Sequence, residues 1–354
     1  MFLKDKELKV PIIQGGMGVG VSLSSLAGAV ASCGGMGVIS AAHAGYREPD
    51  FYTDTLRVNL RCLAQEIQKA KELAGGRGLV GVNVMVAIEH YAEYVTAALK
   101  AGADAIISGA GLPMELPGIA KGFESLLAPI VSSGKAAKTI CRMWDRKAQT
   151  APDFVVIEGS RAGGHLGFSA DAVIEGTAQP LEEILPEVLQ ELAPFEEKYG
   201  RKIPVFVAGG VFDGADIARM EKLGAAGVQM ATRFIATDEC DAAPAYKQAM
   251  VDAKKEDVII TKSPVGMPGR ALRSPLIERI AALGRVAPRR CLKCLRPCDP
   301  AATSYCITDA LIAAVKGDWE NGLFFCGDNV DRVQEIVPVK QLMQQLTEEW
   351  EKNR

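Results

Sequence analysis

Residues 204–231, with the sequence PVFVAGGVFDGADIARMEKLGAAGVQMA, contain the pattern that determines the fold. An apolar run of strand length, Pro204–Ala208, ends in Gly209-Gly210, an amphipathic stretch follows at Gly214–Leu223, and a second apolar run occupies Gly227–Ala231. Strands of a parallel sheet are buried on both faces, so they read as continuous apolar runs between helical segments. This stretch therefore predicts a strand, a helix and a second, parallel strand.

The same unit repeats through the first 255 residues. We expect the other strands at Val10–Gln14, Gly37–Ser40, Leu79–Met85, Ala105–Ser108, Pro129–Ser132 and Phe154–Glu158. The other helices are expected at Leu23–Ser32, Phe51–Leu73, Glu89–Lys100, Glu115–Phe123, Ala136–Gln149, Leu181–Tyr199 and Ala242–Lys254. Eight strands that alternate with helices fit a closed (β/α)8 TIM barrel better than an open sheet. We therefore predict an α/β fold with a barrel domain at residues 1–255.

Residues 256–354 do not continue this repeat. Turn-forming residues predict a loop at Ser263–Arg270, and a cysteine-rich segment follows at Cys291–Cys306. The chain ends in a predicted amphipathic helix at Val339–Trp350. We predict that residues 256–354 form a lid or small second domain over the barrel mouth.

The composition excludes several classes of protein. The chain has 354 residues, of which 48% are hydrophobic and 23% charged, and its net charge is −3. These values exclude a disordered chain and any strong attraction of the whole protein to nucleic acid. No apolar run approaches the roughly 20 residues of a membrane span. We therefore expect a small-molecule substrate and neither nucleic acid nor membrane as a partner.

The N-terminus and the cysteine count bear on the compartment. Residues 1–9 are charged rather than apolar, so they do not resemble a secretory signal. Nine cysteines are an odd number, which does not favour a disulfide framework. We expect reduced thiols and a cytoplasmic location, and the sequence leaves open whether the chain forms a homodimer.

Residues that can carry chemistry follow the predicted strands, at the end of a TIM barrel where active sites lie. These positions include Gln14–Met17, Asn83, Glu158–His165, Gly209-Gly210 and Thr232-Arg233. Tight turns alone would explain the glycines, but turns need no Asn, Lys or His beside them. In addition, loops after the last two strands of such barrels commonly bind phosphate through backbone N–H groups. We therefore expect a phosphate-bearing ligand at this end of the barrel.

His165 is one of three histidines and follows the small residues Gly163-Gly164. An unperturbed imidazole, with a pKa near 6.5, suits a general acid or base at neutral pH, so we predict that His165 is catalytic. His90 begins a predicted helix and is expected to have no function, whereas His43 follows the second strand and could line the mouth. Lys135 either stabilises negative charge on a phosphate or an electron-rich ring, or is a solvated lysine at a helix start.

Several motifs occur in the order found in one enzyme family. They are Pro11–Met17, Gly81-Val82-Asn83, Glu158-Gly159 with Gly163–Gly167, Ala208-Gly209-Gly210 and Gln229–Phe234. Together, over about residues 10–275, they resemble the nitronate monooxygenase (2-nitropropane dioxygenase) family, a relative of the FMN-dependent enoyl-ACP reductase II. The resemblance implies an oxidoreductase built on a TIM barrel that holds FMN noncovalently at its mouth.

The resemblance also implies roles for individual residues. Those expected to contact FMN are Gly15, Gly16, Met17, Asn83, Lys135, Glu158, Gly163, Gly164, Ala208, Gly209, Gly210, Gln229, Met230, Ala231 and Thr232, with the residues from Ala208 onward around the phosphate. His165 would be catalytic, and the substrate would face Met17, His165, Ser263 and Met267. Ala231 stands where relatives commonly have glycine, and its N–H remains usable if its φ is negative.

Two reactions are compatible with these motifs. The first is nitronate monooxygenase-type oxidation of alkyl nitronates, in which His165 removes the α-proton of a nitroalkane or holds the anion as an imidazolium. The alternative is reduction of an enoyl thioester by FMN and NAD(P)H, with an acyl carrier protein as partner. A barrel that binds flavin without turnover is a third reading. The barrel motifs are the same in all three and do not distinguish between them.

Four cysteines lie close together in the C-terminal segment, at Cys291, Cys294, Cys298 and Cys306. Four thiolates match the ligand count of a structural zinc site or an iron–sulfur (Fe–S) cluster, although their spacing matches neither standard pattern. The alternative is a set of reduced, partly buried cysteines in a compact lid. The four residues are therefore a candidate metal site.

Overall fold

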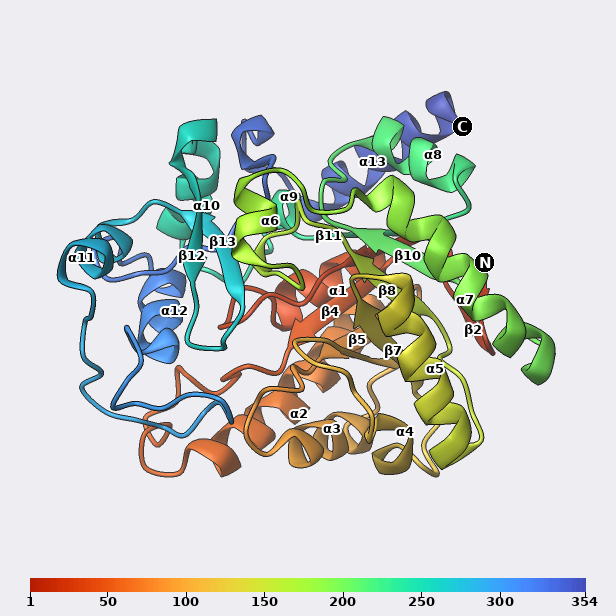
Figure 1. Cartoon of the computed structure of the whole chain (residues 1–354), viewed down its shortest axis with the longest axis horizontal. Helices are drawn as coiled ribbons and strands as arrows, with labels where there is room; N and C mark the ends of the chain where they lie inside the picture. The colour runs from red at the N-terminus through yellow and green to blue at the C-terminus, as the bar shows by residue number, and fades with distance from the viewer.

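Eight parallel strands form a closed barrel in the computed structural model, which describes all 354 residues (Figure 1). They are β3 (Ile12–Gln14), β4 (Met36–Ser40), β5 (Leu79–Asn83), β6 (Ala105–Ser108), β7 (Leu126–Val131), β8 (Val155–Glu158), β10 (Val205–Ala208) and β11 (Gly227–Met230). Each strand pairs with the next in this order, and β11 pairs with β3 to close the ring. The predicted TIM barrel is confirmed.

Helices cover the outside of the barrel. They are α1 (Ser24–Ser32), α2 (Thr55–Ala74), α3 (Tyr91–Lys100), α4 (Leu116–Ile119), α5 (Gly134–Ala148), α7 (Leu181–Tyr199), α8 (Gly214–Lys222), α9 (Thr232–Ile235) and α10 (Pro244–Asp252). The short helix α6 (Ala170–Ile174) has no buried residue and instead contacts β12 (Val258–Lys262). Successive helices pack against each other, as α1 does on α2 and α5 on α7. A hairpin of β1 (Phe2–Leu3) and β2 (Lys6–Glu7) precedes the barrel.

Several predicted elements differ in extent from the observed ones, among them one strand and one short helix of the barrel. Strand β7 begins at Leu126 rather than at Pro129, because the apolar residues before the proline already pair with β6. The helix predicted at Glu115–Phe123 is reduced to the four residues of α4. Gly122, within the predicted span, adopts a φ of +90°, a left-handed conformation that ends helical turns.

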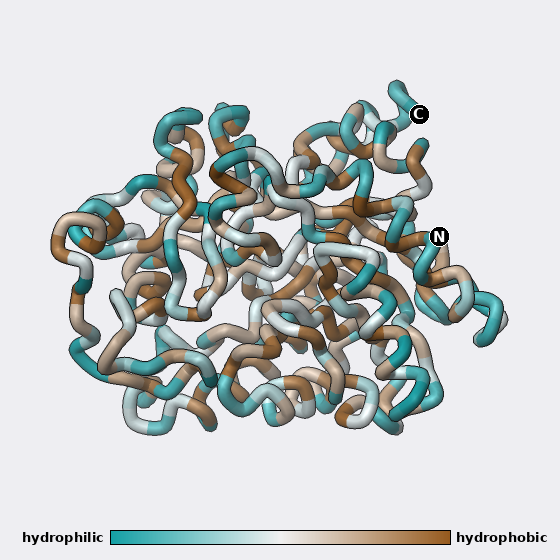
Figure 2. The backbone as a smooth tube through the Cα atoms, viewed as in Figure 1, coloured by the Kyte–Doolittle hydropathy of each residue, from teal (hydrophilic) through white to brown (hydrophobic).

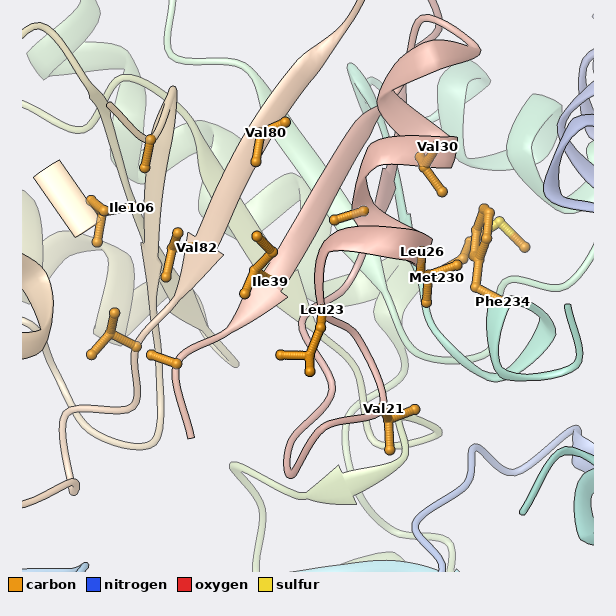
Figure 3. Close-up of a cluster of buried hydrophobic side chains, with 14 of the residues drawn as sticks. Val21, Leu23, Leu26, Val30, Ile39, Val80, Val82, Ile106, Met230 and Phe234 are labelled. Carbon is orange, nitrogen blue, oxygen red and sulfur yellow. The ribbon is translucent and has the colours of Figure 1, made fainter. Parts of the chain in front are cut away.

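Apolar side chains form one layer inside the barrel and another outside it. Successive residues of a strand point to opposite faces, so Val38 belongs to the interior cluster whereas Ile39 packs outward. Figure 3 shows part of the outer layer, where Val80 and Val82 of β5 lie near residues of α1. In Figure 2 the apolar segments run through the interior, whereas many peripheral loops and helix ends are hydrophilic. This packing fixes the strand ends that carry the site.

The segment after the barrel forms a second, small sheet. Strands β12 (Val258–Lys262) and β13 (Pro268–Leu272) make an antiparallel hairpin, and β13 also pairs with β9 (Gly164–His165). The prediction of a loop over Ser263–Arg270 is therefore wrong at its end, because residues 268–270 belong to β13. Pro268 and Gly269 are turn-forming residues, so the sequence did not indicate that a strand begins there.

Three helices follow the small sheet: α11 (Pro275–Leu283), α12 (Ile307–Val315) and α13 (Val339–Asn353), with short 3-10 turns at Lys255–Asp257 and Val330–Arg332. The small sheet, α11 and α12 lie together on one side of the barrel (left in Figure 1). The last helix, α13, returns to the barrel wall, where it packs against α8 and α1 (Figure 1). None of the helices combines the length and apolar character needed to cross a lipid bilayer.

Candidate active site

A cavity lies over the carboxyl ends of the barrel strands, between the strand-end loops and the C-terminal segment. It brings together nearly all of the predicted site residues. Those that line it are Gly15, Gly16, Met17, Asn83, Glu158, Gly163, Gly164, His165, Ala208, Gly209, Gly210, Gln229, Met230, Ala231, Thr232 and Met267. The C-terminal segment closes the cavity with apolar side chains, which include Val265, Leu311 and Phe325.

The structure does not bring Lys135 to this cavity. Its side chain is exposed in the first turn of α5, where Ser133 caps the helix by accepting the Ala136 N–H at 3.2 Å. A residue in this position points along the outer surface of the helix rather than over the barrel. Lys135 therefore matches the alternative of a solvated lysine at a helix start.

One end of the cavity is rich in free backbone donors. The N–H groups of Gly209, Gly210 and Ala231 donate to no other protein atom. Gly209 and Gly210 have φ values of +90° and +97°, which suit glycine. Ala231 has a φ of −130°, so its side chain is accommodated and its N–H remains usable. These amides make this end of the cavity suitable for an anion.

Two arginines, to which the sequence motifs assigned no individual role, add positive charge there. Arg161 lies beside Gly210, where a β-carbon added to the glycine would come 3.4 Å from the Arg161 Cβ and Cδ atoms. Arg233 also lines the cavity and donates to the Phe212 carbonyl at 3.2 Å. Their positions directly after the glycine-rich strand ends are the signal that could have identified them.

A buried donor without a partner faces the same cavity. Asn329, which is only 5% exposed, lines it, and its Nδ2 atom makes no hydrogen bond. Leaving such a group unpaired costs about 1–3 kcal/mol. An acceptor supplied by a bound ligand would remove this cost. The amides and Asn329 together fit a ligand with a phosphate group.

His165 is held in a fixed position within the cavity. Strand β9 places it opposite Gly269 of β13, and Ser263 Oγ lies 2.7 Å from its Nε2 atom. The ring also packs edge-on against Phe325, with 5.1 Å between ring centres. Because Nε2 is engaged by the serine, Nδ1 is the ring nitrogen left for a ligand. Ser263 itself lies behind His165, not on the cavity wall.

Burial lowers the pKa of His165 to about 4. The imidazole is therefore neutral at physiological pH and can accept a proton. This state disfavours the alternative in which an imidazolium holds an anion. A neutral ring with one free nitrogen can accept a proton, but a pKa of about 4 makes it a weaker base than the ordinary imidazole expected from the sequence.

Glu158 ends strand β8 and shares the cavity with His165. Burial raises its pKa to about 7, although a hydrogen bond from the Gly167 backbone partly opposes this effect. The carboxyl is therefore easily protonated near neutral pH. Because this carboxyl titrates near neutral pH, the free energy of unfolding should depend on pH in that range.

In flavin-free protein, the substitution Glu158→Gln is expected to become more stabilising as the pH rises from 5 to 8. The folded-state pKa of about 7 exceeds the ordinary value of 4.5, so the wild-type carboxyl loses its stabilising contribution as the pH rises through that interval. Allowing for partial solvent contact, we expect a difference of about 2 kcal/mol. Thermal unfolding at both pH values measures it, with Glu197→Gln, at an exposed site, as control. An equal effect at both pH values contradicts the assignment.

His43 belongs to a buried hydrogen-bond chain on another part of the cavity wall. The Gly45 N–H donates to Asn59 Oδ1, which orients the amide so that Asn59 Nδ2 donates to His43 Nδ1 at 3.2 Å. The neutral ring then donates from Nε2 to Thr308 Oγ1 at 3.0 Å, and Thr308 donates to Cys294 Sγ at 3.1 Å. Burial lowers the pKa of His43 to about 4, consistent with this neutral state. The chain links α12 to the barrel.

The four cysteines of the C-terminal segment differ in their exposure. Cys291 is exposed and accepts the Lys293 N–H at 3.3 Å, whereas Cys294 lines the cavity. Cys298 and Cys306 are half-buried. No three His, Cys, Asp or Glu side chains come together as a group that could hold a metal ion. The structure gives no support to the candidate metal site.

His90 lies outside the cavity, where its Nδ1 atom is 3.1 Å from Glu93 Oε1 at the start of α3.

The sequence profile of the nitronate monooxygenase family matches residues 1–349. The chain belongs to the nitronate monooxygenase family. The resemblance that the motifs indicated is therefore confirmed at the level of the family.

Individual relatives of this nitronate monooxygenase family member differ in their named activities. A 5-hydroxy-7a-methyl-1-oxo-octahydro-1H-indene-4-carboxyl-CoA dehydrogenase of Mycobacterium tuberculosis is 28% identical over 275 residues, which cover 78% of this chain and 66% of that protein. A probable nitronate monooxygenase of Staphylococcus saprophyticus is 33% identical over 131 residues, covering 36% of this chain and 34% of the relative. The chain thus spans less than two thirds of the length of these relatives.

Among solved structures, FabK from Thermotoga maritima is similar to this chain over almost its whole length. The TM-score is 0.72 and the identity 26%, with 98% of this chain and 94% of FabK covered. The barrel and the C-terminal segment therefore both have counterparts in that protein.

Proposed function

We propose that this chain binds FMN in the barrel cavity and uses it to oxidise alkyl nitronates, including those that His165 forms by removing the α-proton of a neutral nitroalkane. Support for the cofactor comes from the unengaged N–H groups of Gly209, Gly210 and Ala231, because such donors suit the phosphate of FMN. Arg161 and Arg233 lie at the same end and favour a dianion. The phosphate would be held there.

The remaining cavity residues would hold the rest of the cofactor. They are Gly15, Gly16, Met17, Asn83, Glu158, Gly163, Gly164, Gln229 and Met230. When bound, FMN supplies the electron acceptor, and the protein supplies binding, orientation and proton transfer. The apolar side chains of the C-terminal segment would exclude water from this space.

The observation that carries the proposed reaction is the neutral imidazole of His165 in the cavity. In the tautomer in which Nε2–H donates to Ser263 Oγ, the lone pair of Nδ1 is free to accept the α-proton of a nitroalkane. An alkyl nitronate, which has already lost that proton, would need only binding beside the ring. Met17 and Met267, which line the cavity, would contact its alkyl chain.

Reduction of an enoyl thioester, with NAD(P)H as co-substrate, is the second candidate. It is favoured by a relative named for a carboxyl-CoA substrate, because such a substrate is a thioester. Under this alternative the polar groups near His165 would bind the thioester carbonyl, and an acyl carrier protein would be a partner.

An anaerobic titration of the FMN-loaded protein tests these candidates. Propionate-3-nitronate is added first, and NADH is added to a separate sample, while the visible flavin absorbance is followed. Bleaching by the nitronate supports the leading proposal, and bleaching by NADH alone supports the second candidate. If neither compound bleaches a bound flavin, both reactions are rejected.

A further inference from the structure

The C-terminal residues Cys326–Asn329 lie directly against the anion-binding end of the cavity. Gly327 N–H donates to Thr232 Oγ1 at 2.9 Å, and Asp328 N–H donates to the Arg161 carbonyl at 3.1 Å. These two bonds fix the segment to the loops that follow β8 and β11. The chain thus passes over the site from a part of the sequence far from the barrel strands.

This close approach depends on a glycine in the loop after β8. A β-carbon added to Gly163 would come 2.5 Å from the carbonyl carbon of Cys326 and 2.7 Å from the nitrogen of Gly327. Real side chains do not tolerate such contacts with backbone atoms. The lack of a side chain at position 163 therefore permits the segment to reach the cavity.

Asn329 is the residue of this segment that remains unsatisfied. Its side chain is buried and lines the cavity, but Nδ2 has no partner in the protein. The neighbouring carboxylate of Asp328 is paired with Arg161 at 2.9 Å and with Lys255 at 2.9 Å, so its charge is compensated. An anion could therefore approach Asn329 without meeting an unpaired carboxylate.

We propose that Asn329 binds the phosphate of FMN, with its Nδ2 amide donating to a phosphate oxygen beside the N–H groups of Gly209, Gly210 and Ala231. The inference rests on the proposed FMN binding and adds the C-terminal segment to the phosphate site. The phosphate site would then include a side chain from the C-terminal segment in addition to the barrel residues. Bound cofactor would consequently hold residues 326–329 in place.

Equilibrium titrations with FMN and with riboflavin, which lacks the phosphate, test this assignment. The variant Asn329→Asp removes the donor and adds a negative charge, so the Kd for FMN should rise about 30-fold. The Kd for riboflavin should change less than about threefold, since riboflavin makes no phosphate contact. Asn353→Asp makes the same charge change at an exposed position and should leave both Kd values unchanged.

Asn329→Ala, which removes the donor without adding charge, should weaken FMN binding about tenfold and serves if the aspartate variant does not fold. Equal weakening of FMN and riboflavin would indicate a structural role and overturn the assignment. Unchanged FMN binding by both variants would overturn it as well. If wild-type protein binds neither flavin, the proposed function itself fails, which is a separate outcome from the failure of Asn329 alone.

Discussion

Replacing His165 with alanine should lower the turnover of a neutral nitroalkane about a thousandfold while FMN remains bound. The imidazole is neutral and its Nδ1 atom is free, so its removal eliminates the proton acceptor in the cavity. FMN binding should persist because the unengaged amides at the other end of the cavity are untouched. Steady-state kinetics, together with the flavin content of the purified variant, provide the measurement.

Two companion measurements sharpen this test. Ser263→Ala removes the hydrogen-bond partner of His165 without removing the base, so we expect a loss of only about tenfold in kcat. A preformed nitronate has no α-proton to remove, so His165→Ala should impair its oxidation less than that of the nitroalkane. Equal rates of nitroalkane turnover in wild type and His165→Ala would reject the role as base.

Gly209→Ala should raise the Kd for FMN about 100-fold. Gly209 adopts a φ of +90°, and an added β-carbon would lie 2.8 Å from the nitrogen of Ala162 and 2.9 Å from the carbonyl oxygen of Gly159. The backbone must therefore shift, which moves its N–H group away from the position suited to a phosphate. Flavin fluorescence during titration of the apoprotein measures the change.

Gly122 provides a matched control for this substitution. It has the same φ of +90°, but an added β-carbon would meet no atom within 4 Å, and the residue does not line the cavity. Gly122→Ala therefore reproduces the left-handed strain without the clash. It should lower stability but leave FMN affinity unchanged, and a comparable loss of affinity in both variants would contradict the phosphate site.

The sequence predicted the barrel and most of the site because both depend on local patterns. Apolar runs such as Val205–Ala208 mark buried parallel strands, and residues directly after them, such as Gly209 and His165, must lie at one end of a barrel. For the same reason, the order of the strands followed from their order in the chain.

Features that depend on distant parts of the chain were not predictable in this way. Asn329 reaches the cavity because its neighbours Gly327 and Asp328 bond to residues that lie far from them in sequence. The position of Lys135 was misjudged because a strand-end residue can also begin a helix and face outward. The spacing of the cysteines indicated a ligand count but could not show that Cys294 turns toward the cavity and Cys291 toward solvent.

FMN binding at the mouth of the barrel is the property on which the proposed function depends most directly. Flavin-free protein is titrated with FMN while the quenching of flavin fluorescence and the visible spectrum are followed. We expect uptake of one FMN per chain, saturable and weakened by Gly209→Ala but not by Gly122→Ala. A wild-type protein that remains folded and takes up no FMN would contradict the account.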